Sequence, residues 1–210
     1  MNLRGLCAAL ASLVVLVVTA GCAGGSDGTG TQVSVNGRSG WHGTPVRTGY
    51  PLPAQEFTDT AGETVVPAED PDRPVTLVFF GYTHCPDICN VVLANIASAL
   101  RGSPDAVRDA TRLVFISTDP ARDTPETLRE YLDRFDPAYT GLVAPVATVE
   151  QAARALHISY ERPDGSTGGY EVAHGTYTTA FVDGSARLVW AEDTSVAGLR
   201  ADLRRLVRLA

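Results

Sequence analysis

Residues 75–89 of this chain read VTLVFFGYTHCPDIC, and they decide its fold. The first six are β-branched, aliphatic or aromatic, which is typical of a strand buried inside a sheet. Residues 90–100 then place apolar side chains three and four positions apart, which predicts a helix with one buried face. The chain therefore passes from a buried strand into a helix, and Cys85 and Cys89 lie at that turn.

The two cysteines are four residues apart at the start of the predicted helix. This spacing places both side chains on one helical face, near enough to bind one metal ion or to form a disulfide. The helix N-terminus favours negative charge, so it lowers the thiol pKa and favours the thiolate. We interpret the pair as a functional site, and a structural disulfide is the alternative.

The N-terminus has the pattern of a bacterial lipoprotein signal. Arg4 precedes an apolar run over residues 6–18 that is too short to span a bilayer comfortably. Thr19-Ala20-Gly21-Cys22 follows and resembles a lipobox. We expect residues 1–21 to be removed as a signal peptide and Cys22 to carry the lipid anchor. An ordinary secretory signal with a chance cysteine is the alternative.

The composition after the signal predicts one tethered domain. Residues 22–44 are rich in small and polar residues, so we expect a flexible tether from the lipidated cysteine. Residues 45–210 would then form a single domain on the extracytoplasmic face of the cell membrane. Cys7 leaves with the signal, so Cys85 and Cys89 are the thiols expected in the domain. The net charge of −7 argues against a nucleic-acid partner.

The order of the predicted elements indicates an α/β fold. Thr124, Thr148 and Ser195 are expected to cap three helices. The pattern predicts a hairpin at 56–66, strands at 112–117, 144–147, 177–182 and 188–191, helices at 125–135, 149–156 and 196–209, and a polar loop at 163–169. This is the order of a thioredoxin-like fold with an added N-terminal β-hairpin and a βα insertion. Sites in such sheets gather at the carboxyl ends of strands, where Cys85 and Asp119 are placed.

Three blocks of the sequence resemble the SCO/SenC family. Residues 79–89, FFGYTHCPDIC, are similar to its cysteine motif, and residues 114–125, VFISTDPARDTP, are similar to its second block. His174, shortly before a strand that ends in Asp183-Gly184, matches the third block. The blocks occur in the family's order, and the resemblance extends from about residue 52 to the C-terminus.

This resemblance implies a thioredoxin-like, membrane-tethered copper protein in which Cys85, Cys89 and His174 bind Cu(I) or Cu(II). Such proteins serve the assembly of the binuclear copper centre of cytochrome c oxidase subunit II, or of another exported cuproprotein. They act there as metallochaperones or as thiol reductants. Two positions depart from the family pattern: Asn90 replaces a proline after the second cysteine, and Ala173 replaces an aspartate before the histidine. The second departure concerns the orientation of His174.

The residue types support copper without the resemblance. Two thiolates and one imidazole form a soft ligand set that suits Cu(I), whereas structural zinc usually takes four ligands. Dithiol redox chemistry is the alternative from a different class: Cys85, nearer the helix start, would attack as the thiolate and Cys89 would resolve. A thiol peroxidase is a third option. We expect a metallochaperone, and an extracytoplasmic thiol–disulfide oxidoreductase is the alternative.

The polar residues around the motif have secondary assignments. We expect His84 to be a solvated neighbour that tunes the thiol pKa, and Asp87 to bond backbone amides at the helix start. For Asp119, Arg122 and Asp123 we expect a loop held by an Arg–Asp pair and helix capping, with direct action on the site as the alternative. Surface positions are expected for His42 and His157, packing roles for Trp41 and Trp190, and a position beside the site or in the core for Tyr82.

Overall fold

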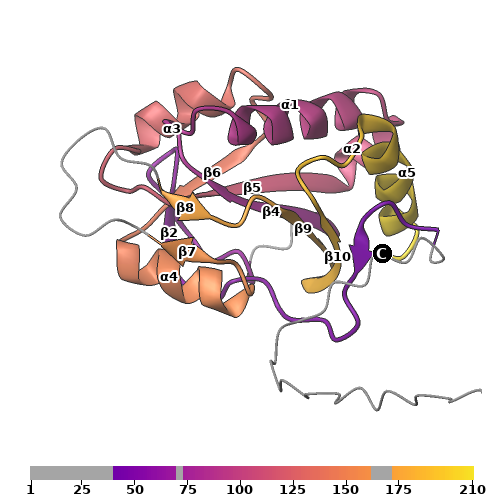
Figure 1. Ribbon diagram of the computed structural model, residues 1–210, viewed down its shortest axis with the longest axis horizontal. Coiled ribbons are helices and arrows are strands. Elements are labelled where there is room, and N and C mark those ends of the chain that lie inside the picture. Colours follow the sequence, from indigo (N-terminus) through magenta and orange to yellow (C-terminus); the bar gives the residue numbers. More distant parts are fainter. Residues whose placement is uncertain (1–39, 70–72, 162–171) are drawn as a thin grey trace, which may run out of the picture. The chain divides into compact units, whose positions relative to one another are not determined.

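The computed structural model describes residues 40–69, 73–161 and 172–210, and the core of this part of the chain is an eight-stranded mixed sheet (Figure 1). Strands β4 (Val75–Gly81), β5 (Thr111–Ser117) and β6 (Thr140–Val143) run parallel to one another. The remaining neighbours pair antiparallel. Across the sheet the order is β1 (Thr44–Pro45), β10 (Ser185–Trp190), β9 (Thr178–Val182), β4, β5, β6, β2 (Phe57–Asp59) and β3 (Thr64–Val65).

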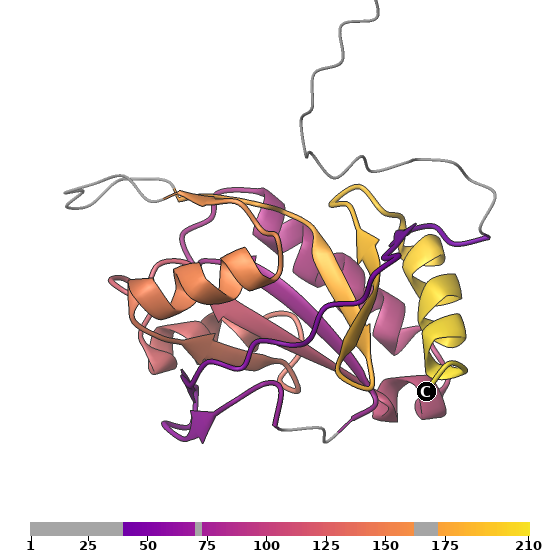
Figure 2. The same ribbon diagram turned by 90° about the horizontal axis from the view of Figure 1, so that it is seen from below.

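Helices cover both faces of this sheet. One face carries α1 (Ile88–Arg101), α2 (Asp105–Asp109), α3 (Pro125–Leu132) and α5 (Val196–Val207), and the other carries α4 (Val146–Ala155), as the view from below shows (Figure 2). Side chains of β4 alternate between the two layers: Leu77 and Phe79 pack in the α1 layer, Val78 and Phe80 in the α4 layer. Burial on both faces explains why β4 is apolar without alternation.

The predicted α/β order and most of its boundaries are confirmed. The hairpin at 56–66 is β2 with β3, which adds to the sheet edge beside β6. The Thr124 hydroxyl accepts a hydrogen bond from the Thr127 N–H at 3.2 Å at the start of α3. The Ser195 hydroxyl accepts one from the Gly198 N–H at 3.1 Å at the start of α5. These bonds satisfy backbone donors that a helix N-terminus leaves free.

One strand and one helix start were predicted in the wrong place. The strand expected at 144–147 is β6, four residues earlier, and α4 begins at Val146 instead of after Thr148. Pro145 is the N-cap of α4 with φ of −54°, the value that its ring imposes. A proline at this position ends a strand and has a backbone angle suited to the start of a helix. This effect outweighs the β-propensity of the neighbouring valine. Helix α3 also ends at Leu132, before the expected end near residue 135.

Four short elements were not predicted. Two of them, α2 and β1, have five and two residues, and the other two form a separate ribbon of β7 (Tyr160–Glu161) with β8 (Ala173–His174). Elements this short carry no measurable periodicity, so a sequence pattern cannot reveal them. The loop expected at 163–169 lies outside the described residues, as do the expected signal peptide and Cys22.

Residues 40–44, at the end of the expected tether, contact the C-terminal helix. The buried carboxylate of Asp202 in α5 accepts hydrogen bonds from the backbone N–H groups of His42 (3.0 Å) and Gly43 (2.9 Å) and from the indole of Trp190 (2.8 Å). Charge-assisted bonds of this kind offset the cost of burying the carboxylate. These residues therefore pack as part of the domain. Within the described residues, no helix combines the length and apolar character needed to cross a bilayer.

Replacing Asp202 with Asn should lower the free energy of unfolding by about 2–4 kcal/mol, because the amide loses the charge that strengthens these bonds and places an NH2 group where Oδ1 now lies 3.1 Å from the His42 backbone nitrogen. Urea denaturation followed by circular dichroism measures the change. Asp109→Asn, at an exposed position of α2, is the matched control and should stay within about 0.5 kcal/mol of the parent. Equal midpoints for the two variants would contradict the assignment.

Candidate metal centre

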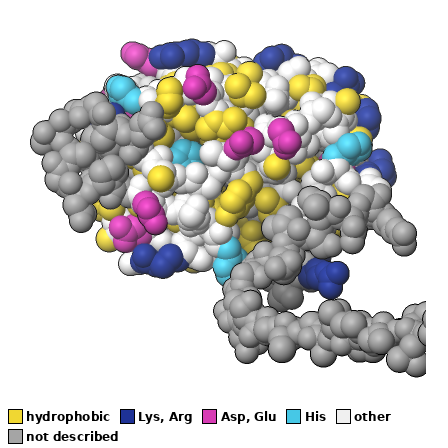
Figure 3. All heavy atoms as spheres, viewed as in Figure 1, with side chains coloured by type: hydrophobic (Ala, Val, Ile, Leu, Met, Phe, Trp, Pro, Cys, Tyr) yellow, Lys and Arg dark blue, Asp and Glu magenta, His cyan; other side chains and the backbone are white. Residues whose placement is uncertain are grey.

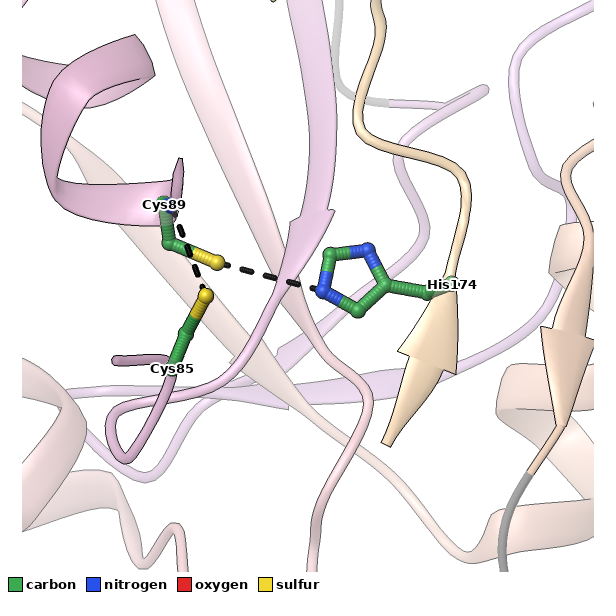
Figure 4. Close-up of side chains that lie close together, drawn as sticks. All are labelled: Cys85, Cys89 and His174. Atoms are coloured by element: carbon green, nitrogen blue, oxygen red, sulfur yellow. Dashed lines mark hydrogen bonds between the residues drawn. The ribbon is translucent and has the colours of Figure 1, made fainter. Parts of the chain in front are cut away.

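Three side chains from three different elements meet at the carboxyl end of β4 (Figure 4). Cys85 lies in the loop after β4, Cys89 in the first turn of α1, and His174 in β8. Their ligand atoms all lie within 4.8 Å of one another, and Cys89 Sγ is 3.8 Å from His174 Nε2. Both cysteines are free thiols. The structure thus brings together all three residues that the sequence proposed as ligands.

His174 reaches the thiols because of how its ribbon is fixed. In β8 it pairs with Tyr160 of β7, whose hydroxyl donates to the backbone carbonyl of Thr118 at 2.9 Å, just beyond the end of β5. The imidazole packs edge-on against the rings of Tyr82 (5.8 Å between centroids) and Phe79 (6.4 Å). These contacts hold the ring over the cysteines. Tyr82 was expected either beside the site or in the core. It is buried and it also flanks the site.

The Nδ1 atom of His174 fixes the orientation of the imidazole ring. This atom lies 3.1 Å from the backbone oxygen of Gly175, and a carbonyl can only accept, so Nδ1 carries the proton. Nε2 points toward the thiols, 3.8 Å from Cys89 Sγ. A backbone carbonyl therefore takes the orienting role that the absent carboxylate at Ala173 would otherwise have.

The two thiols have opposite pKa shifts. The pKa of Cys85 is lowered to about 4, first by the hydrogen bond from the Cys89 thiol and against the effect of burial. The backbone N–H of Cys89 also donates to Cys85 Sγ at 3.4 Å, which adds the first turn of α1 to the stabilisation of the thiolate. The pKa of Cys89 is raised by its hydrogen bond to Cys85 and by burial. At neutral pH, Cys85 is the thiolate and Cys89 the thiol.

The loop after β5 lies next to the cysteine loop and is held in place by an ion pair and hydrogen bonds. Arg122 pairs with the buried carboxylate of Asp119, as expected. Asp123 is also buried, which raises its pKa, and its carboxylate accepts hydrogen bonds from Ser117 and Thr83. Among the described residues, the metal-binding cluster consists of the two cysteines and the histidine, so these carboxylates are not part of it.

The other secondary assignments have mixed outcomes. His84 is exposed, with Nδ1 2.9 Å from the Thr83 hydroxyl. Asp87 is the N-cap of α1, but its side chain makes no capping hydrogen bond, so that expectation was wrong. Its φ of −135° and ψ of −65° differ from the extended conformation from which a capping side chain reaches the helix amides. His157 and His42 are both exposed, as expected, and the His42 backbone N–H also donates to Asp202.

A cavity of about 310 Å³ opens beside the ligands. It is lined by Tyr82, Cys85, Pro86, Asp87, Ile88, Val172, Ala173, His174 and Thr176. In the space-filling view from the side of Figure 1, hydrophobic side chains gather near the middle of this face with acidic ones among them, and basic side chains lie toward its periphery (Figure 3). The cavity gives a small partner segment access to Cys85 and His174, whereas Cys89 is fully buried and does not line it.

The fold and the site together define a class: a thioredoxin-like protein with a dithiol–imidazole metal centre at the ends of its parallel strands. The chain belongs to the SCO1/SenC family, whose model matches residues 52–208. This confirms the family and the thioredoxin-like fold expected from the sequence.

Solved structures and curated relatives agree with that assignment. The solution structure of apo Sco1 from Thermus thermophilus superimposes with a TM-score of 0.72 at 28% identity and covers 79% of this chain and 96% of its own. Copper-bound ScoI of Bradyrhizobium japonicum gives 0.63 at 31% identity over 76% and 99%. Protein SenC of Rhodobacter capsulatus is 36% identical over 99 residues, 47% of this chain and 44% of its own. The chain spans 28% to 55% of the length of the curated relatives it matches.

Iodoacetamide should alkylate Cys85 of the metal-free, reduced protein at pH 6 far faster than Cys89, because only Cys85 is a thiolate there. Since its pKa is lowered to about 4, the rate should hold from pH 8 to pH 5 and fall below pH 4. Peptide mass spectrometry measures the labelling. In a Cys85→Ser control, Cys89 should react slowly at pH 6, and preferential labelling of Cys89 in the parent would refute the assignment.

Proposed function

We propose that this protein binds copper through Cys85, Cys89 and His174 and delivers it to the binuclear copper centre of cytochrome c oxidase subunit II. The observation that carries the proposal is the convergence of two sulfur atoms and one imidazole nitrogen within 4.8 Å. Sulfur and imidazole ligands in a three-membered set favour Cu(I) and also accept Cu(II). A structural zinc site would need a fourth ligand, and the cluster holds three among the described residues.

The site is built for ligand exchange. Cys85 is already a thiolate and can bind a cation without losing a proton, whereas Cys89 must release its proton. The adjoining cavity leaves Cys85 and His174 within reach of cysteines from an acceptor. Each copper ligand of this protein is then replaced in turn by a ligand of the acceptor, so the copper ion is never released free into solution.

The partner in this proposal follows from membership of the SCO1/SenC family, and the anchor follows from the lipobox-like residues 19–22. We therefore keep the lipidated Cys22 and the extracytoplasmic face of the membrane as part of the proposal. Another exported cuproprotein is the alternative acceptor.

A second function is favoured by the low pKa of Cys85. As a thiol–disulfide oxidoreductase, the Cys85 thiolate would attack a disulfide of the partner and release one thiolate, leaving a mixed disulfide. Cys89, after losing its proton, would attack Cys85 Sγ, release the partner's second thiol and close a Cys85–Cys89 disulfide. The two activities are compatible, because acceptor cysteines must be reduced before they can bind copper.

Reduced protein titrated with Cu(I) under nitrogen against a competing chelator should bind one equivalent. His174→Ala should weaken the affinity at least tenfold, because it removes one of three ligands. His42→Ala, exposed and outside the cluster, is the matched control and should stay within threefold of the parent. Failure to bind Cu(I) tightly, or equal affinities for the two variants, would refute the copper proposal.

Disulfide exchange separates the two functions. His174→Ala should reduce a disulfide-bonded test peptide at a rate within about threefold of the parent, because the thiolate and the resolving thiol are both retained. Cys89→Ser should stop the reaction at the mixed disulfide, which mass spectrometry detects. A His174→Ala rate reduced a hundredfold would assign the histidine to the redox reaction instead.

A further inference from the structure

The buried carboxylate of Asp123 connects the loops that follow β4 and β5. It lies just before α3 and is 1% exposed. Its Oδ1 accepts from the Thr83 hydroxyl at 2.6 Å, and its Oδ2 accepts from the Ser117 hydroxyl at 2.6 Å. The backbone N–H of Thr83 also donates to this carboxylate, at 3.2 Å from Oδ2. One carboxylate therefore holds both the backbone and the side chain of Thr83.

Thr83 in turn determines the position of Cys85. Only one residue separates them, and the Cys85 N–H donates to the Tyr82 carbonyl at 3.2 Å, which closes a tight turn around Thr83. Because this turn is short, a displacement of Thr83 moves Cys85 Sγ. That sulfur is the acceptor for the Cys89 N–H and a member of the metal-binding cluster.

The other end of the connection is rigid. The Asp123 N–H donates to the Asp119 carbonyl at 2.9 Å, and Asp119 is paired with Arg122. This backbone bond and the Asp119–Arg122 pair anchor Asp123 in the loop after β5, so Asp123 joins the cysteine turn to that loop.

We propose that Asp123 is a positioning residue of the copper site, acting through Thr83 to hold Cys85 Sγ at the distance that Cys89 and His174 require. Asp123 itself does not contact a ligand, and this inference rests on the proposed copper-binding function. It adds a residue pair, Asp123 and Thr83, that the metal-binding cluster does not contain.

The chain supplies a matched pair of variants for the test. Thr83→Val and Ser117→Ala each remove one hydroxyl bond of 2.6 Å to Asp123, but only the first bond leads to the cysteine turn. Ser117→Ala also removes the acceptor of the Asp119 N–H, at 3.1 Å, but it keeps the backbone bond from the Asp123 N–H to the Asp119 carbonyl that anchors Asp123. If the carboxylate served stability alone, the two variants would affect copper equally. Thr83→Ser keeps the hydroxyl and is the conservative variant that should restore the parent's properties.

Cu(I) competition titrations should show an affinity about tenfold lower for Thr83→Val and within threefold of the parent for Thr83→Ser and Ser117→Ala. The Cu(II) thiolate-to-metal absorption band should shift in Thr83→Val and return in Thr83→Ser. Urea denaturation of all three variants measures the general loss of stability, which should be as large for Ser117→Ala as for Thr83→Val.

A second readout needs no copper. Glutathione disulfide oxidises the Cys85–Cys89 pair to one protein disulfide and releases two glutathione molecules, so the equilibrium constant reports the relative position of the two sulfurs. Thr83→Val should shift this constant about threefold or more toward the disulfide, because the reduced state loses the well-placed bond to the Cys85 thiolate. Ser117→Ala should leave it unchanged.

The two readouts distinguish the possible failures. If the parent does not bind Cu(I) but Thr83→Val still shifts the glutathione equilibrium, the copper function is wrong and the positioning role stands for a redox site. If Thr83→Val matches the parent in both readouts, or if Ser117→Ala changes them as much, Asp123 does not position Cys85.

Discussion

The parallel pairing of β4 with β5 is the constraint on which the rest of the site depends. The register runs from Val75↔Thr111 to Gly81↔Ser117, so both strands end at the same level. A Cβ at Gly81 would lie 2.8 Å from the Phe115 ring, so glycine at the end of β4 leaves room for that ring in its present position. The Thr118 N–H then donates to the Gly81 carbonyl at 2.7 Å. This ending places the cysteine turn beside the loop that carries Asp123.

That arrangement brings negative groups together in a partly buried region, and each has its own compensation. The Cys85 thiolate accepts bonds from Cys89, while Arg122 balances Asp119. Among the residues that the structure describes, no cation pairs with Asp123 in this way, and its pKa is raised, mainly by burial. A carboxyl group with a raised pKa stabilises the fold less as the pH rises through that pKa. The ionised form of Asp123 therefore depends on the hydrogen bonds from Ser117 and Thr83.

Local patterns in the sequence were sufficient where local forces decide the structure. They predicted β4, α1 and the caps at Thr124 and Ser195, because apolar periodicity and capping act within a few residues. They failed at β6 and α4, where a proline outweighed propensity, and they gave no sign of the bonds from residues 42 and 43 to Asp202, 160 positions away. The two cysteines were identified from spacing alone. His174 could be placed only by resemblance, since its two-residue strand has no pattern of its own.

The orientation of His174 shows why the departure at position 173 does not remove the ligand. Ala173 is exposed and its side chain offers the imidazole no hydrogen-bond acceptor. The Gly175 carbonyl accepts the Nδ1 proton and carries no net charge. Glycine at position 175 also suits the packing, because a Cβ there would lie 2.8 Å from the Tyr177 ring. The backbone therefore fixes the tautomer of His174 through a group that no side-chain substitution removes and no change of pH titrates.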